Sequence, residues 1–514
     1  MTESRTKNSA RNILSGMILK FFLILMPFIV RTVIIKKIGM EYLGLNSLFT
    51  SILQVLSLSE LGFSLAVSFC LYKPIELKDT ALVCALINFL KKVYYVIGII
   101  ILIIGVSLLP FLPSLISGDY PKDINIYLLY LIFLFNSVIS YFLFSYYGVI
   151  LSASQRTDID NKINLLFSTF MYLSQIIVLL VTKNYYLYII FLPLSTILMN
   201  LFRMIICKKI YPEYIPSGSL PKEERILIKQ KIKALIGHKL AYTIVASTDS
   251  IFISAFLGLI LLAQYQNYFY IITSLMAIVN TLQSAIIASI GNSLAFESKE
   301  KNYHDFICLT FLNVWMIGWM SICLICLYQP FIKLWIGEDN LLPMSTVLLL
   351  TIYFYSWRFK DMVSVYKDAA GMWTSDFFKP YVIAIINIIL DFILVKYMGL
   401  NGVIIATILS VPVVSIPWET HCLYNEYFCM KTRFYYIRLL VYTIIIVIIG
   451  FLTYYLCSLL PLYDIPSFIL RLFICGIVPN IIIILISFRT KEFLWFKNKI
   501  KMIIKKQKKE SKDV

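Results

Sequence analysis

The sequence predicts an all-α polytopic membrane protein with about fourteen transmembrane helices, in two six-helix lobes followed by two C-terminal helices. The first observation is composition: 60% of the 514 residues are hydrophobic and only 14% are charged. Soluble proteins carry about 25% charged residues, so most of this chain is expected in lipid. The second is the length of the apolar runs, which repeatedly reach the roughly 20 residues that a helix needs to cross a bilayer. The third is the uneven distribution of Lys and Arg between these runs.

Fourteen apolar segments account for the predicted spans. They cover residues 13–36, 43–71, 89–113, 124–150, 161–182, 185–207, 235–257, 260–291, 305–328, 341–366, 378–398, 402–428, 437–459 and 466–489. Turn-forming and charged stretches such as Gly118–Pro121 and Gly399–Gly402 separate them. Helix is favoured over strand because an open strand leaves backbone groups unsatisfied in lipid, and the alternating pattern of a barrel is absent from the sequence.

The basic stretch between the sixth and seventh segments is the longest polar interruption and is predicted to link two lobes. The predicted organisation is a cytoplasmic N-terminus (1–12), a first lobe (13–207), a basic cytoplasmic linker (208–234), a second lobe (235–428), two further helices (429–489) and a basic cytoplasmic tail (490–514). Isoleucines alternate with the bases after residue 225, so part of the linker is expected to form a helix on the anionic inner leaflet. The first apolar run has the full length of a helix and follows a polar start, so no cleavable signal peptide is expected.

The placement of basic residues predicts the topology. With a cytoplasmic N-terminus, alternating spans and most basic residues near a span end counted with the adjoining loop, thirty-four of the 46 Lys and Arg residues are cytoplasmic, six are outside and six are within spans. Basic residues accumulate on the cytoplasmic side of membrane proteins. Both termini and the linker are therefore expected in the cytoplasm of a multi-pass protein.

A helix–glycine–helix plan occurs twice, at an offset of 219 residues. Gly39 aligns with Gly258, Leu43 with Leu262, and the match continues without gaps. Internal repeats of this kind are typical of transporter folds whose site lies near the repeat interface.

Ionisable residues within the spans are the main candidates for function, because a charge at the bilayer centre costs at least about 2.5–3.5 kcal/mol. They are Lys20, Arg31, Glu60, Asp249, Arg358, Lys360, Asp361 and Asp391. Arg203 and Arg471 lie near span ends and are expected to snorkel towards water. The ten cysteines are scattered, and Cys323 and Cys326 form a CxxC inside an apolar run, which favours packing over a metal or redox site.

Five stretches carry a resemblance to a known family. They are Ser59–Ile75, Ser247–Leu259, Ala288–Lys301, Pro330–Gly337 and Lys367–Pro380. In this order they resemble the bacterial polysaccharide-export flippases, the Wzx-type transporters of lipid-linked oligosaccharides in the multidrug/oligosaccharidyl-lipid/polysaccharide superfamily. The resemblance implies a transporter in the bacterial cytoplasmic membrane that flips an undecaprenyl-pyrophosphate-linked repeat unit for O-antigen (lipopolysaccharide), capsule or exopolysaccharide. It also implies membrane lipids, a polysaccharide polymerase and chain-length machinery as partners, and no nucleic acid.

A flippase must carry a pyrophosphate through hydrocarbon, so fixed cations are expected along its path. The predicted substrate-binding residues are Lys20, Arg31, Arg358 and Lys360. Lys20 and Arg31 are eleven residues apart, which places them within about 20° of one another around a helix and about 16 Å apart along it. They could form a two-step ladder for phosphate, or each could pair with an acid such as Glu60 or Asp391. Arg358 could instead be neutralised by Asp361, three residues away.

A coupling cation is the second expected ligand, and no other cofactor or metal is expected. The predicted residues for H⁺ or Na⁺ are Asp249, Ser247, Thr248, Glu60 and Asp391. Hydroxyls beside a carboxylate suit a hard cation or proton transfer. Close packing of small polar residues between helices is the alternative for the Asp249 region, and a structural role is the alternative for Glu60 and Asp391.

Two other classes of function are alternatives to the flippase. A cation-coupled multidrug or metabolite antiporter of the same superfamily remains open, although it favours an acidic cavity and span 1 offers Lys and Arg. A membrane enzyme needs a sizeable outside loop or a clustered acid–base set, and the outside segments are short. Enzyme activity is therefore not expected.

Overall fold

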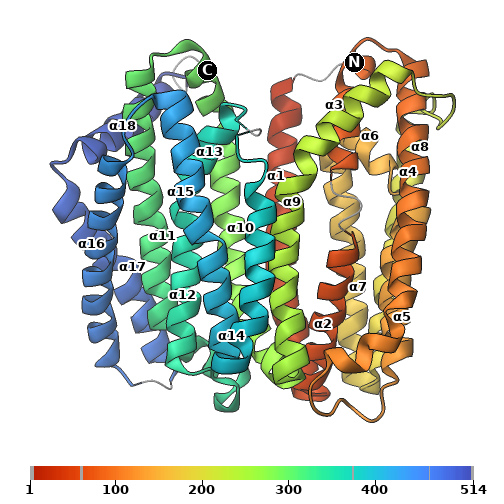
Figure 1. The fold of residues 1–514 in the computed structure, drawn as a ribbon, viewed down its shortest axis with the longest axis horizontal. Coiled ribbons are helices and arrows are strands. Elements are labelled where there is room, and N and C mark those ends of the chain that lie inside the picture. Colours follow the sequence, from red (N-terminus) through yellow and green to blue (C-terminus); the bar gives the residue numbers. More distant parts are fainter. Residues whose placement is uncertain (1–4, 58–61, 373–374, 462–463, 511–514) are drawn as a thin grey trace. The chain divides into compact units, whose positions relative to one another are not determined.

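The computed structural model of the chain describes residues 5–57, 62–372, 375–461 and 464–510. These residues form helices joined by short connections, and no strand occurs in the ranges just given. Figure 1 shows the helices running side by side in bundles. The predicted all-α class is thus confirmed. The chain divides into two compact units, Met1–Ala263 and Gln264–Val514.

Among the residues that the structure describes, nine α-helices lie wholly in the first unit, besides a 3-10 helix at Leu109–Leu115. They are α1 (Arg5–Lys37), α2 (Met40–Leu56), α3 (Phe63–Glu76), α4 (Thr80–Ser107), α5 (Ile126–Phe142), α6 (Tyr147–Ala153), α7 (Thr157–Thr182), α8 (Tyr185–Ile210) and α9 (Lys222–Leu257). Helix α7 packs against α1 and α8, α5 packs against α8, and α2 packs against α9. The sequence places the lobe boundary within 208–234, whereas the contacts of α9 with α2 and α3 group it with the first unit. The extent of each lobe stays a prediction.

The second unit is built around one buried helix, α11 (Lys299–Ile336). Of its most apolar stretch, 61% of residues are buried, against 33% or less in the other apolar spans described. The remaining helices are α10 (Leu259–Phe296), which begins in the first unit, α12 (Met344–Phe359), α13 (Asp361–Ala369), α14 (Lys379–Ser410), α15 (Pro412–Cys422), α16 (Arg433–Ser458), α17 (Ile465–Ser487) and α18 (Lys491–Glu510). Helices α12, α16, α17 and α18 all pack against α11.

The apolar segments predicted as spans fall on helices, but several of the fourteen segments are short or interrupted helices. Nine described helices are long and apolar enough to span a membrane, or ten if the bent pair α5 and α6 forms one span. Three predicted segments are shorter or interrupted helices: α2 with α3, the apolar end of α9, and α12 with α13. Two more predicted segments meet within α14, where Gly399 has a non-helical conformation (φ 56°, ψ −134°). The count of fourteen therefore stays a prediction.

The glycines at the repeated helix breaks share one backbone conformation. Gly39, between α1 and α2, has φ 126° and ψ 171°, and Gly258, between α9 and α10, has φ 91° and ψ 172°. L-residues with a side chain rarely adopt a positive φ of this kind. The two breaks therefore have matching geometry as well as matching sequence. Close by, Gly44 of α2 lies against the first residue of α10, and a Cβ at Gly44 would stand 2.3 Å from the carbonyl oxygen of Leu259.

Gly44→Ala should destabilise the first unit, because the added methyl group meets backbone rather than a movable side chain. Overpacking of this kind costs about 1–3 kcal/mol. Gly476→Ala in α17 is the matched control, since a Cβ there meets no described atom within 4 Å. Thermal unfolding of the detergent-solubilised proteins should show a lower midpoint for Gly44→Ala alone. An unchanged midpoint would show that α2 and α10 do not pack this closely.

Candidate functional site

A cavity of about 620 Å³ lies in the first unit. Its only cation among the described lining residues is Arg31 of α1, and no described lining residue is Asp or Glu. Side-chain amides and hydroxyls make up its polar surface: Asn46, Gln54, Asn136, Gln175, Thr50, Ser57, Ser137, Tyr172 and Tyr188. This volume falls in the range of small-molecule sites, about 300–1,000 Å³.

Helix periodicity explains why α2 contributes so many polar groups to this cavity. Asn46, Thr50 and Gln54 are spaced four residues apart, so they share one face of α2. Two further lining side chains, from α5 and α7, are held by hydrogen bonds: Asn136 Oδ1 accepts from Thr196 Oγ1 at 2.8 Å, and Gln175 Nε2 donates to the Tyr188 carbonyl oxygen at 3.4 Å. The cavity therefore combines a guanidinium with many neutral groups able to bind hydroxyls.

A second cavity of the first unit, of about 340 Å³, is lined by serines and by Arg203. Snorkelling was predicted for Arg203, and that prediction is wrong. The side chain is buried, and its Nε lies 2.6 Å from Asp160 Oδ1 while Nη1 donates to Asn200 Oδ1 at 2.8 Å. Because Asp160 and Asn200 accept its hydrogen bonds, the Arg203 guanidinium is satisfied without reaching water.

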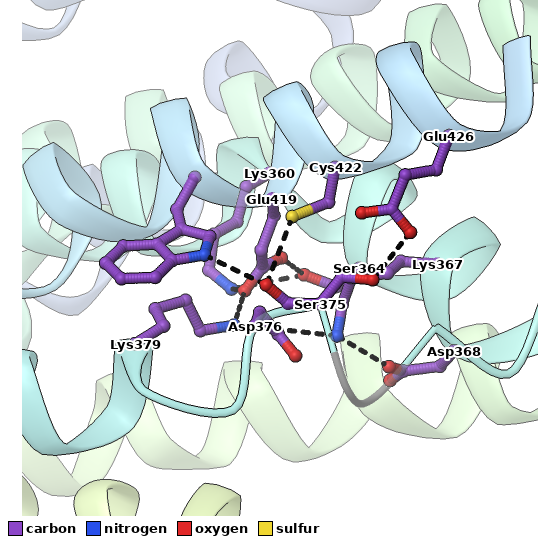
Figure 2. Close-up of polar contacts among 11 residues, drawn as sticks. Lys360, Ser364, Lys367, Asp368, Ser375, Asp376, Lys379, Glu419, Cys422 and Glu426 are labelled. Atoms are coloured by element: carbon purple, nitrogen blue, oxygen red, sulfur yellow. Dashed lines mark hydrogen bonds and ion pairs between the residues drawn. The ribbon is translucent and has the colours of Figure 1, made fainter.

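In the second unit a buried network joins lysines to carboxylates, as Figure 2 shows. Glu419 of α15 accepts from Lys360 Nζ at 2.8 Å and from Lys379 Nζ at 2.5 Å. Asp376 accepts from Lys379 Nζ at 2.5 Å and from Lys367 Nζ at 2.8 Å. Ser364 donates to the other Glu419 oxygen. Buried charges are tolerated when they are paired in this way.

Lys367 lies in the last turn of α13 and is 2% exposed. Burial disfavours its charged form, but three nearby carboxylates outweigh burial and raise the pKa of Lys367 above its ordinary value of 10.5. The carboxylates belong to Asp368, Glu419 and Asp376. Because the folded pKa is the higher one, the stabilisation is complete below about pH 10.5 and is lost only as the pH rises through the raised pKa.

The predicted substrate cations separate into two groups. Arg31 lines the first-unit cavity, whereas Lys20 is exposed on α1 and is not among the described residues lining that cavity. Arg358 and Lys360 are held by protein partners. Arg358 Nη1 donates to Asn280 Oδ1 at 2.7 Å and lies 3.5 Å from Asp361 Oδ2, and Lys360 pairs with Glu419. These contacts fit the structural alternative for Arg358.

The predicted coupling-ion residues lie in different places. Ser247 and Asp249 are buried in α9, and Thr248 donates to the Ile244 carbonyl oxygen at 2.9 Å. Asp391 is fully buried in α14. Glu60 lies outside the described residues.

Sequence reasoning misses most of the buried network. Lys367 and Asp376 fall between predicted spans, so a search restricted to spans passes over them. Lys379 and Glu419 lie within predicted spans but are not among the candidates selected there. The local signal was the spacing of Lys367, Asp376 and Lys379, nine and three residues apart, whereas Glu419 lies 40 residues beyond Lys379.

The geometry and fold define the class of the chain as a polytopic helical membrane protein with a polar internal cavity. No protein-family model matches the sequence, and no curated protein matches it. Solved structures do share the fold. A lipid II flippase MurJ, in an inward closed conformation, superimposes with a TM-score of 0.64 at 16% identity over 92% of this chain and 99% of that chain.

Two multidrug-transporter structures share the fold as well. An inward-facing multidrug resistance MATE family transporter of the MOP superfamily gives a TM-score of 0.58 at 15% identity, over 78% of this chain and 97% of that chain. A mutant of the Vibrio cholerae MATE transporter VcmN gives a TM-score of 0.55 at 14% identity, over 82% of this chain and 99% of that chain. The chain thus has the fold of MOP-superfamily transporters. These three structures are of transporters or flippases, not enzymes.

Glu419→Gln should strongly destabilise the second unit, because Lys360 and Lys379 would lose a shared buried counter-charge. Removing one partner of a buried ion pair costs about 3–5 kcal/mol. Glu297→Gln is the control, since its pair with Lys301 is largely exposed and such pairs are worth about 0–1 kcal/mol. The thermal midpoint in detergent should fall for Glu419→Gln and stay unchanged for Glu297→Gln. Equal midpoints would contradict a structural role for the network.

Proposed function

We propose that this chain flips undecaprenyl-pyrophosphate-linked oligosaccharide repeat units from the inner to the outer leaflet of the bacterial cytoplasmic membrane. The product would serve O-antigen, capsule or exopolysaccharide synthesis, with both termini and the 208–234 linker in the cytoplasm. The observation that carries the proposal is the first-unit cavity, in which Arg31 is surrounded by amide and hydroxyl side chains. A guanidinium binds phosphate oxygens in pairs, and neutral polar groups bind sugar hydroxyls.

The fold supports the proposal from a second direction. A protein named as a lipid II flippase shares it over nearly the whole of both chains. A lipid-linked substrate therefore fits the architecture. The polysaccharide polymerase and chain-length machinery are proposed partners because they would use the flipped repeat unit.

The second candidate function is a cation-coupled multidrug or metabolite antiporter, which the MATE structures favour. A carrier of cationic drugs needs a carboxylate in its cavity to offset the positive charge of the drug. The described residues lining the first-unit cavity supply Arg31 and no Asp or Glu. The lining therefore favours the anionic substrate.

Arg31→Ala should abolish export of the polysaccharide and leave lipid-linked repeat units on the inner leaflet. Arg31→Lys should restore only part of the activity, because an ammonium cannot form the paired contacts of a guanidinium. The measurement is the amount and sidedness of undecaprenyl-linked intermediates in cells expressing equal amounts of each variant. Loss of folded protein in Arg31→Ala, rescued by removing an acid, would instead support structural pairing. Normal export from Arg31→Ala would remove this residue from the substrate path.

A coupling cation is the remaining part of the proposal. In α9, the fully buried Ser247 hydroxyl donates to no described acceptor, and Asp249 lies two residues further on. In α14, Asn387 Nδ2 donates to Thr407 Oγ1 at 3.3 Å, one turn from the buried Asp391. Asp391 thus has an amide one turn away, itself bonded to a hydroxyl, which suits Na⁺ or a proton. For Asp249 the support is its burial in α9, since Ser247 lies two residues away on a different side of the helix.

Asp249→Asn and Asp391→Asn should each lower transport by tenfold or more while folded protein in the membrane stays within about twofold of wild type. The reason is that an amide cannot bind a proton or neutralise Na⁺. Transport per folded molecule, measured with and without a Na⁺ or pH gradient, tests this. Wild-type transport by either variant at equal protein would exclude that residue from coupling.

A further inference from the structure

Three cysteines distant in sequence meet in the second unit. Cys326 comes from α11, Cys457 from α16 and Cys475 from α17, and their Sγ atoms all lie within 4.8 Å of one another. The Sγ atoms of Cys457 and Cys475 are 3.8 Å apart. All three side chains are at most 2% exposed. The sequence favours packing for the CxxC, and Cys326 does lie in an apolar core cluster; its proximity to Cys457 and Cys475 is what the sequence does not show.

The thiols adjoin a cavity of about 330 Å³ with further soft and cationic groups on its wall. Cys326 and Cys457 line it together with Met344, whose thioether is also a soft donor. Arg471 and Lys333 line it too, and none of the described lining residues is Asp or Glu. The cavity therefore offers sulfur atoms next to positive charge.

Arg471 shows that this cavity is suited to a negatively charged group. Snorkelling was predicted for Arg471, but the residue is only 4% exposed, so that prediction is wrong. Its Nη2 donates to the Leu460 carbonyl oxygen at 2.7 Å, while its Nε has no acceptor among the described residues. A buried guanidinium nitrogen without an acceptor is costly. A metal–thiolate group carrying net negative charge would provide the missing counter-charge.

We propose that Cys326, Cys457 and Cys475 form a binding site for a soft monovalent metal ion, Cu(I). Thiolates prefer soft metals, and Cu(I) accepts a low coordination number. Three thiolates around one trigonal metal ion with bonds of about 2.3 Å lie about 4.0 Å apart, close to the 3.8 Å between Cys457 and Cys475 and within the 4.8 Å that bounds all three pairs. Binding breaks three S–H bonds, releases three protons and transfers no electron. The resulting net charge of −2 lies beside the cavity that Arg471 lines; Lys333, also on its wall, is already paired with Glu338 at 2.7 Å.

A metal ion at this site would link three helices. Helices α16 and α17 are the last two spans, and both pack against α11. One metal ion held by all three helices would fasten the C-terminal pair to the central helix. A ligand that binds only the folded state raises stability, so Cu(I) should raise the unfolding temperature.

The test titrates the purified full-length chain, reduced and under argon, with Cu(I) against a chromogenic Cu(I) chelator. Wild-type protein should withhold one Cu(I) per chain, and Cys326→Ser, Cys457→Ser and Cys475→Ser should each weaken retention at least tenfold. Cys323→Ser is the matched control, because Cys323 lies one turn from Cys326 and is not one of the three converging thiols. Cu(I) should raise the unfolding midpoint of wild type and of Cys323→Ser only.

A measurement on wild-type protein keeps the test independent of variant folding. Bound Cu(I) should slow maleimide labelling of Cys326, Cys457 and Cys475, read by peptide mass spectrometry, and leave the exposed Cys429 unchanged. Equal labelling with and without Cu(I), or equal retention by the three Ser variants and wild type, would overturn the proposal. So would a Cys457–Cys475 disulfide in freshly purified protein, which would assign these thiols to redox chemistry instead.

Discussion

The high free energy of a charge in hydrocarbon is the constraint on which the rest of this structure depends. A Lys, Arg, Asp or Glu within the bilayer must face an opposite charge, a polar cavity or water. The chain meets this constraint in two ways. Buried pairs compensate some charges: Lys360 and Lys379 with Glu419 in the second unit, and Arg203 with Asp160 in the first. Arg31 instead lines a cavity whose described walls are amide, hydroxyl and apolar.

Local features of the sequence were enough to predict the fold class. Apolar runs of helix length can form only helices in lipid, so composition and run length determine the secondary structure. Glycine breaks were also visible, because Gly39 and Gly258 repeat in a matching context and both have positive φ. Interrupted spans were not predicted, although both breaks fall at polar or glycine residues: Glu60 and Gly62 precede α3, and Lys360 and Asp361 lie between α12 and α13. These residues were placed inside continuous spans because the flanking apolar runs together reach the length of a crossing.

The site was only partly predictable for a related reason. Depth in a span was enough to select Arg31, but the polar lining around it comes from α2, α5, α7 and α8, and only packing brings these together. Helix periodicity places Lys20 and Arg31 on one face of α1, but the packing of the other helices leaves Lys20 exposed. The contacts that were missed join residues far apart in the sequence: Glu419 with Lys360, and Cys326 with Cys457 and Cys475. A single sequence holds no signal for such distances.

The fold is shared with a lipid II flippase and with multidrug transporters, so it does not decide between an anionic lipid and a cationic drug. The lining of the first-unit cavity does bear on that choice. Evolution of function on a common fold changes the groups that face the substrate. The described lining of this cavity comprises one guanidinium and neutral polar and apolar side chains, and the proposed substrate is chosen to fit it.

The most direct measurement is translocation by purified protein in liposomes of two lipids with the same oligosaccharide. One carries the sugar on undecaprenyl pyrophosphate, and the other carries it on an uncharged polyprenyl ether. The account predicts translocation of the pyrophosphate lipid at least tenfold faster than of the neutral one. Equal rates for both lipids, or efflux of a cationic dye with no translocation of either, would contradict it.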